Sequence, residues 1–387
     1  MKYGRFFWGA LCILFAASQL GCDKFEMPDD PEKQTGGYIS LEEVARLLAA
    51  VPLGSEQMAE VQDAAGASAG NGYDEEYPMR NLFGFPGCGV GEMTETRAEK
   101  YARPLRDLLR EALLTTKAGD MEDPEAWLDS LANSDVQIYW PESHRWDGDA
   151  LPVITYDPGD GADRNEGYEL QPDGSVRKVM VSEEMTLEQP VWVVNRNSDA
   201  DYTSLELLRR ADPNWGHGGG DILITKAGTS EIRTLVLRSF KAHRQYDSWF
   251  AGASEFFCRA GSVEDFTAST EAEMRLYEPS ITDFMIVVRR NQVGVELPFN
   301  AILVSEWTDQ LESIAYMMTE DDGGTRSTWK ANATVKYNSK SYGIELELPL
   351  NSRDDIVWRG NLSRAFIEKN SGKSVRFGDV ELVLELI

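Results

Sequence analysis

The clearest candidate for metal chemistry in this chain is a run of oxygen-bearing side chains between residues 195 and 206. Their spacing, at positions 1, 3, 5, 7, 9 and 12, is that of an EF-hand-type calcium loop closing on a Glu that opens a helix. The predicted ligands are Asn195, Asn197, Asp199, Asp201 and Glu206. Asn replaces Asp at the first position, and Ala200 replaces the usual turn Gly. Two interpretations stay open: a calcium loop, or a polar loop whose side chains cap the next helix.

A second group of acidic residues lies at predicted strand ends in the C-terminal half. It comprises Asp247, Asp309, Asp354, Asp355 and residues 320–322. The loops of a β-sandwich gather at its two ends, so some of these carboxylates are expected to converge on a cation. The alternative is that they are solvated turn residues.

An aromatic and polar cluster around Pro141 is the candidate ligand-binding surface. Trp140, His144 and Trp146 lie close together in sequence, and their rings could stack on a sugar or a peptide. The alternative is that the tryptophans belong to the hydrophobic core.

No catalytic motif fits its surroundings. Ser68 lies in a hydrolase-like Gly-x-Ser-x-Gly pattern, but it stands in a predicted small-residue loop, Gly66–Gly72, that follows a helix rather than a strand. The three histidines lie far apart, without the close ligand spacing of a zinc site. We therefore expect a non-enzymatic binding or adhesion module with a glycan or protein ligand. The alternative is a metal-dependent hydrolase using clustered carboxylates, which a concave pocket with convergent acids and shifted pKa values would favour.

The charge balance excludes nucleic acid as a partner. The chain has 38 Lys and Arg against 65 Asp and Glu, a net charge of −27. Such a surface repels polyanions, which bind basic patches. Two cysteines lie beyond the N-terminal segment, Cys88 and Cys258. Cys258 stands in an apolar, strand-like run that begins at Glu255, which predicts a buried free thiol, although a bridge between the two cysteines stays open.

The N-terminal residues predict secretion and a lipid anchor. Lys2 and Arg5 precede an apolar run, Phe6–Ala17, that is too short to span a membrane. Gly21 followed by Cys22 is typical of a bacterial lipoprotein signal, with Cys22 as the lipid-attachment residue. We expect residues 1–21 to be the signal peptide and residues 22–37 a flexible acidic tether. The predicted location is the cell envelope, with the outer membrane favoured.

The elements that must position these side chains predict an α+β fold. Residues 38–132 read as mainly helical, with Ser40 capping a helix whose apolar residues recur at helical spacing. Residues 133–220 form a small β-containing region. Residues 221–387 form a predominantly antiparallel region that ends in a β-sandwich.

Two stretches of strict alternation are the strongest strand signals. Apolar residues alternate with polar ones from Trp329 to Tyr337 and again from Ile344 to Leu348, which predicts a half-buried antiparallel hairpin. The segment from Val380 to Leu386 repeats the pattern.

Two segments carry a resemblance to known proteins. The run from Arg244 to Phe257 and the later run from Asp354 to Gly360 resemble uncharacterised secreted lipoproteins of Gram-negative bacteria. The resemblance covers most of residues 135–387. It implies an envelope location and a β-rich C-terminal half, and it brings no known activity.

Overall fold

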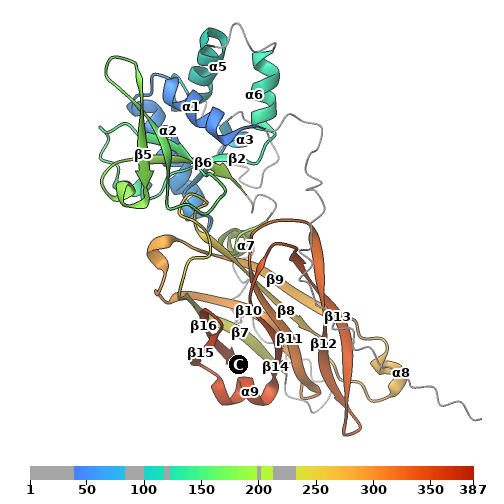
Figure 1. Ribbon diagram of the computed structural model, residues 1–387. Helices are drawn as coiled ribbons and strands as arrows, with labels where there is room; N and C mark the ends of the chain where they lie inside the picture. Colours follow the sequence, from blue (N-terminus) through green and yellow to red (C-terminus); the bar gives the residue numbers. More distant parts are fainter. Residues whose placement is uncertain (1–38, 83–99, 117–122, 198–201, 212–231) are drawn as a thin grey trace, which may run out of the picture. The chain divides into compact units, whose positions relative to one another are not determined.

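Local sequence signals set the helices of the N-terminal half (Figure 1). The computed structural model describes residues 39–82, 100–116, 123–197, 202–211 and 232–387. Helix α1 (Leu41–Ala50) begins after Ser40, whose Oγ accepts from the amide of Glu43, as predicted. Further helices follow: α2 (Ser55–Gly70), α3 (Met79–Leu82), α5 (Leu105–Thr116) and α6 (Pro124–Ala132).

A six-stranded sheet in the order β1-β2-β6-β3-β4-β5 accompanies these helices. Its pairings are antiparallel except for β3 against β6, which run parallel. The strands are β1 (Glu76–Pro78), β2 (Val136–Tyr139), β3 (Val153–Tyr156), β4 (Arg164–Leu170), β5 (Val176–Ser182) and β6 (Val191–Arg196).

The predicted helical region and the predicted small β region share one core. Leu48 of α1 and Leu109 of α5 belong to the same buried cluster as Ile138 of β2 and Trp192 of β6. Strand β1, from the helical region, pairs with β2. The chain therefore does not divide into two domains at residue 132, because the apolar faces of the helices need the sheet to cover them.

The C-terminal half is a β-sandwich, as predicted. One sheet has the order β10-β7-β16-β15, and the other has β13-β12-β11-β8-β9 with β14 also paired to β11. The strands are β7 (Arg233–Ala242), β8 (Ser254–Ser262), β9 (Ser280–Val288), β10 (Leu297–Trp307), β11 (Leu311–Glu320), β12 (Arg326–Tyr337), β13 (Lys340–Asn351), β14 (Asp355–Ser363), β15 (Lys373–Phe377) and β16 (Val380–Leu386).

Large side chains from both sheets fill the sandwich core. The rings of Phe240 (β7) and Phe256 (β8) lie 5.2 Å apart, and both side chains are fully buried. Short helices α7 (Leu205–Ala211), α8 (Glu271–Met274) and α9 (Arg364–Asn370) connect the strands. Cys258 is a buried free thiol whose Sγ lies 2.9 Å from the hydroxyl of Tyr316, as predicted for an apolar strand.

The predicted hairpin is confirmed by the register of β12 and β13. Trp329 faces Leu348 and Ala333 faces Ile344 across the pair. Asn338 and Ser339 form the connection, with positive φ of 47° and 62°. The predicted terminal strand is also confirmed, as β16.

Two local predictions differ from the structure. Gly66–Gly72 was expected to be a loop, but α2 continues to Gly70, because alanines favour the helix and its apolar face packs on the core. Strand β4 was not predicted, since its polar and glycine residues give little strand signal and its pairing with β3 and β5 decides its conformation.

Within the described residues, no helix combines the length and apolar character needed to cross a membrane. Cys22, the tether and Cys88 lie outside the described residues.

Candidate binding site

A cavity of about 320 Å³ lies where four segments far apart in sequence meet. The segments are the residues before β1, the end of β2, the 3₁₀ helix Glu183–Leu187 and the residues after β9, and Trp249 from the β7–β8 loop adds a wall. A volume near the lower end of the usual range for ligand sites suits a small ligand or one side chain of a larger one.

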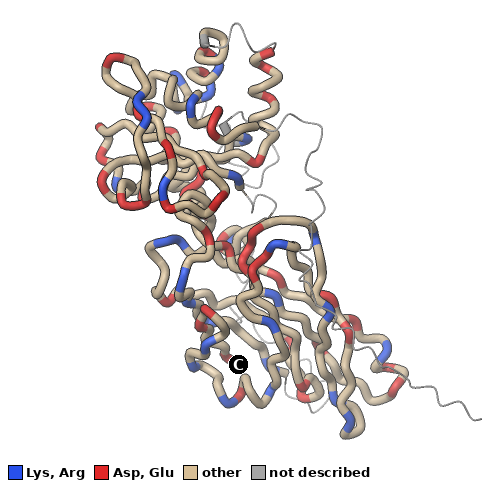
Figure 2. The backbone as a smooth tube through the Cα atoms, in the orientation of Figure 1, with Lys and Arg blue, Asp and Glu red and all other residues tan. Residues whose placement is uncertain are grey.

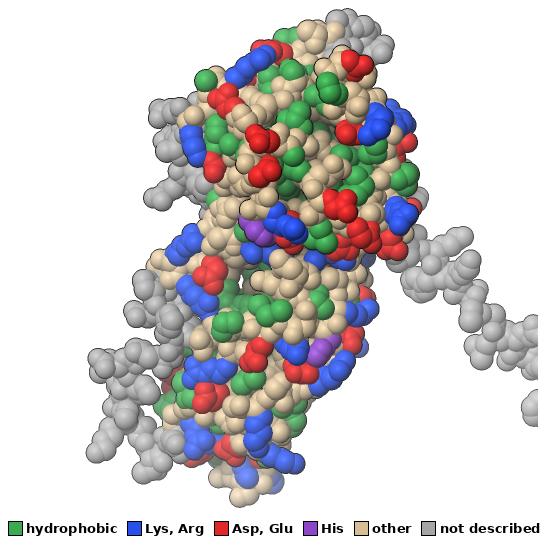
Figure 3. All heavy atoms as spheres, turned by 90° about the vertical axis from the view of Figure 1, so that its left-hand side faces the viewer, with side chains coloured by type: hydrophobic (Ala, Val, Ile, Leu, Met, Phe, Trp, Pro, Cys, Tyr) green, Lys and Arg blue, Asp and Glu red, His purple; other side chains and the backbone are tan. Residues whose placement is uncertain are grey.

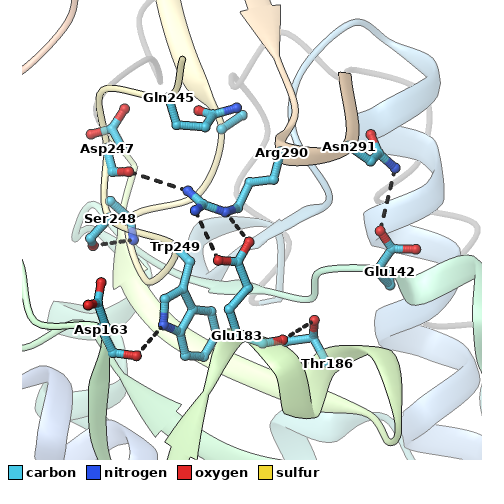
Figure 4. Close-up of polar contacts among 12 residues, drawn as sticks. Glu142, Asp163, Glu183, Thr186, Gln245, Asp247, Ser248, Trp249, Arg290 and Asn291 are labelled. Atoms are coloured by element: carbon cyan, nitrogen blue, oxygen red, sulfur yellow. Dashed lines mark hydrogen bonds and ion pairs between the residues drawn. The ribbon is translucent and has the colours of Figure 1, made fainter. Parts of the chain in front are cut away.

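Arg290 is held by two partners at this cavity (Figure 4). Its guanidinium forms a two-point ion pair with Glu183, with Nη2 3.0 Å from Oε2, and its Nη1 donates to the backbone carbonyl of Asp247 at 3.3 Å. Two parallel N–H···O contacts fix the plane of the guanidinium. Arg290 therefore positions Glu183 and ties the β7–β8 loop to the cavity.

Arg289 is also engaged. Its Nη2 donates to the backbone carbonyls of Ala69 and Tyr73, at 2.8 and 3.0 Å, and its Nε lies 3.9 Å from Asp74 Oδ1. Asp74 accepts from the amide of Ala253 at 2.8 Å. Neither arginine of the cavity is left to meet an anionic ligand.

Asp74 is the most perturbed acid of the cavity. It is 3 % exposed, and burial is the main cause that raises its pKa to about 6, with the neighbouring Glu75 adding to the effect. Gly252 permits this close packing. Its φ is +121°, and a Cβ there would lie 3.0 Å from Asp74 Oδ2.

Glu75 and Glu142 form the acidic rim. Both carboxylate oxygens of Glu75 accept hydrogen bonds: Oε1 from the amide and hydroxyl of Ser143, and Oε2 from the amide of Glu142. Glu142 Oε1 lies 3.4 Å from Asn291 Nδ2, a long contact that leaves this carboxylate weakly engaged.

The remaining wall is apolar. Tyr139 and Trp249 are almost fully buried, and the Trp249 Nε1 donates to the backbone carbonyl of Asp163 at 3.0 Å, which fixes its ring. Pro141 also borders the cavity, and the Leu187 side chain, 54 % exposed, lies at its lip.

The cavity carries more negative than positive charge. Five acidic side chains and two arginines border it, and the arginines are already paired. Charges of both signs are interspersed along the rest of the chain (Figure 2), and on the face in Figure 3 apolar side chains form small groups between charged ones. The cavity is therefore suited to a ligand with a positive charge on an apolar stem.

The predicted aromatic cluster lies beside this cavity. Trp140 and Trp146 border a neighbouring cavity of about 240 Å³, with ring centroids 6.0 Å apart. Trp140 is 1 % exposed and also packs edge-on against Trp192, so it has no open face for a sugar. His144 lies at the surface near Glu75 and Glu142, with 66 % of its side chain exposed.

The three described residues of the predicted calcium loop contact different parts of the protein. Asn195 Nδ2 donates to the carbonyls of Phe250 and Ala251, and Asn197 Nδ2 donates to Glu76 and Gln137. Glu206 pairs with Arg209 at 3.0 Å. Asp199 and Asp201 lie outside the described residues, so calcium binding by this loop stays a prediction.

The second acidic group divides in the structure. Asp309 pairs with Arg364 at 2.9 Å, and Asp354 accepts from the amide of Asn351. Asp247 and Glu320 instead come together with Glu255, which was expected only as part of an apolar strand.

The cavity itself was not predicted. Its key residues are Asp74, Glu75, Glu183, Trp249, Arg289 and Arg290. The only local signal was the Arg289-Arg290 pair directly after a strong strand in a very acidic chain.

No protein-family model, curated protein or solved structure matches this chain. The resemblance to secreted lipoproteins therefore stays a prediction.

Proposed function

We propose that this protein is an envelope-anchored binding module whose cavity takes a basic side chain of a protein ligand. The observation that carries the proposal is the excess of negative charge around an apolar wall, in a cavity whose own arginines are already paired. A Lys or Arg side chain supplies both an apolar stem and a charge. The small volume favours one side chain over an oligosaccharide.

A peptide and glycan array on the whole chain is the first test. Peptides with exposed Lys or Arg should bind, and substitution of that residue by norleucine should abolish binding. Affinity should fall as salt rises, because the rim is open to solvent. Preferential binding of neutral glycans would contradict the proposal.

Leu187 provides a sharper test. Leu187→Ser should weaken peptide binding about tenfold, because the apolar stem loses one contact at the lip. Leu276→Ser removes another exposed leucine, from the sandwich, and should leave affinity unchanged. Equal affinities for the two variants in calorimetry would place the ligand elsewhere.

The alternative, a hydrolase, has one observation in its favour. Asp74, with a pKa raised to about 6, lies in a concave cavity among other acids. However, Glu75 and Glu183 are held by protein donors, and the group of three carboxylates close enough to share a metal does not border the cavity. If a substrate is found, loss of turnover with retained binding in Asp74→Asn would favour the enzyme.

The proposal of a lipid anchor is based on the N-terminal sequence. Cys22 is proposed to carry the lipid, and the acidic residues after it are proposed to hold the folded part away from the membrane. Cys22→Ala should move the protein from the membrane pellet to the soluble fraction, and a variant that stays in the pellet would contradict the anchor.

A further inference from the structure

Three carboxylates meet at one end of the sandwich: Asp247 of the β7–β8 loop, Glu255 at the start of β8 and Glu320 at the end of β11. We call them the acid triad. One oxygen from each lies within 4.8 Å of the other two. Strands β8 and β11 are neighbours, with Glu320 opposite Phe256, which brings the two glutamates together.

Glu320 occupies a position that an apolar residue would normally fill. Along β11 it continues the alternating series of Tyr316 and Met318, both core residues. Its side chain is fully buried, and neither of its carboxylate oxygens has a hydrogen-bond partner among the described residues. A buried ionised carboxylate without a partner is costly, so this position implies either a missing positive charge or a proton on the carboxylate.

The neighbouring groups that the structure describes, taken in turn, hold other partners. Ser254 Oγ donates to Gln245 Oε1 at 2.6 Å, so its proton is directed away from Glu320. Arg259, buried nearby on β8, pairs with Asp283 and donates to Thr319. Asp247 Oδ2 is also buried without a partner, while its backbone carbonyl faces Arg290.

From this geometry we propose that Asp247, Glu255 and Glu320 bind one calcium ion. All the ligands are oxygens, which suits calcium or magnesium rather than zinc. Oxygens that share a calcium ion at about 2.3–2.6 Å can lie up to about 4.6–5.2 Å apart, and the three oxygens lie within that separation. Calcium is the ion that is usually held by several protein carboxylates, whereas magnesium usually keeps several of its water molecules.

The half-exposed side of Asp247 leaves room for the water molecules that complete a calcium shell.

The competing explanation is that Glu320 and Asp247 share a proton, since burial and the neighbouring Asp247 raise the pKa of Glu320 far above its ordinary value. Protonation and calcium binding make opposite predictions for added calcium.

Isothermal titration calorimetry and thermal unfolding of the full chain test the proposal. We expect one calcium ion per chain, a rise in Tm of a few degrees at a hundredfold excess over Kd, and little response to magnesium at matched ionic strength. No binding at millimolar calcium would overturn the proposal and leave the shared proton. An equal response to magnesium would overturn it in favour of unselective binding of divalent cations.

Matched variants locate the ion. Glu320→Gln keeps the side-chain shape without the charge, so it should fold in chelator and lose at least tenfold in calcium affinity. Glu278→Gln removes an exposed carboxylate of the sandwich and should bind as the wild type does. Asp247→Asn provides a second loss-of-binding variant in a half-exposed loop. Unchanged affinity in both triad variants, with loss in Asp199→Ala combined with Asp201→Ala, would place the ion in the 195–206 loop instead. None of these outcomes depends on the peptide ligand.

Discussion

Two neighbouring groups of acidic side chains differ in whether the protein supplies partners for their carboxylates. Around the cavity, Glu75 accepts three hydrogen bonds and Glu183 pairs with Arg290. In the acid triad, Glu320 is more deeply buried and has no partner among the described residues. The same residue type is thus held by protein donors in one place and left without a hydrogen-bond donor in the other, where we propose a calcium ion. Partners, rather than the number of carboxylates, distinguish the two sites.

The largest expected effect on stability is at Asp74, the buried acid of the cavity whose pKa is raised. Its pKa is raised from 3.8 to about 6, so the native state loses stability as pH rises through this range. The full shift corresponds to about 3 kcal/mol. Asp74→Asn should therefore be more stable than wild type by up to about 3 kcal/mol at pH 8 and nearly equal to it at pH 4.

Urea unfolding in chelator at the two pH values measures this difference. Asp149→Asn makes the same change at an exposed position and serves as the control. If Asp74→Asn is no more stable than wild type at pH 8, the amide of Ala253 and the nearby Arg289 fully offset the cost of burying the Asp74 carboxylate.

A smaller effect is expected from Arg290, which links the two groups. Arg290→Ala removes the pair with Glu183 and the donor to the Asp247 carbonyl, and should cost about 2 kcal/mol of unfolding free energy. Arg275→Ala, which removes a largely exposed partner of Glu271, should cost less than about 0.5 kcal/mol. Similar losses for the two variants would mean that the ion pair at the cavity stabilises the fold no more than an exposed pair does.

The smallest effect is expected at the rim. Glu75→Gln replaces an acceptor by an amide group facing the backbone N–H of Glu142, and should cost about 1 kcal/mol. Glu188→Gln, at an exposed position of the same half, should change stability very little. Thermal unfolding at pH 7 compares them, and a neutral Glu75→Gln would show that the rim hydrogen bonds do not stabilise the fold.

The fold was more predictable than the sites because its signals are local. Ser40 and the helical spacing after it define α1, and alternation alone predicts the β12–β13 hairpin. The sequence left two interpretations of Trp140 open, and its burial in the core follows from contacts with Trp146 and Trp192 that only the folded chain creates.

The sites depend on long-range pairing. Glu255 looked like part of an apolar strand, and only the pairing of β8 with β11 brings Glu320 to it. The packing of Asp74 against Gly252 likewise joins segments that no sequence pattern connects. Sequence patterns identified Asp247 and Glu320 as candidates but not their third partner.

The position of β16 has a consequence for how the chain folds during synthesis. It lies between β7 and β15, so the first strand of the sandwich stays unpaired on that side until residues near Leu386 have been made. The N-terminal sheet has all its strands by Arg196. At about 5–20 residues per second, the chain between β7 and β16 takes roughly 7–28 s to be made. Until then the edge of β7 that pairs with β16 in the folded sheet has no partner strand, and an open strand edge can pair with other chains.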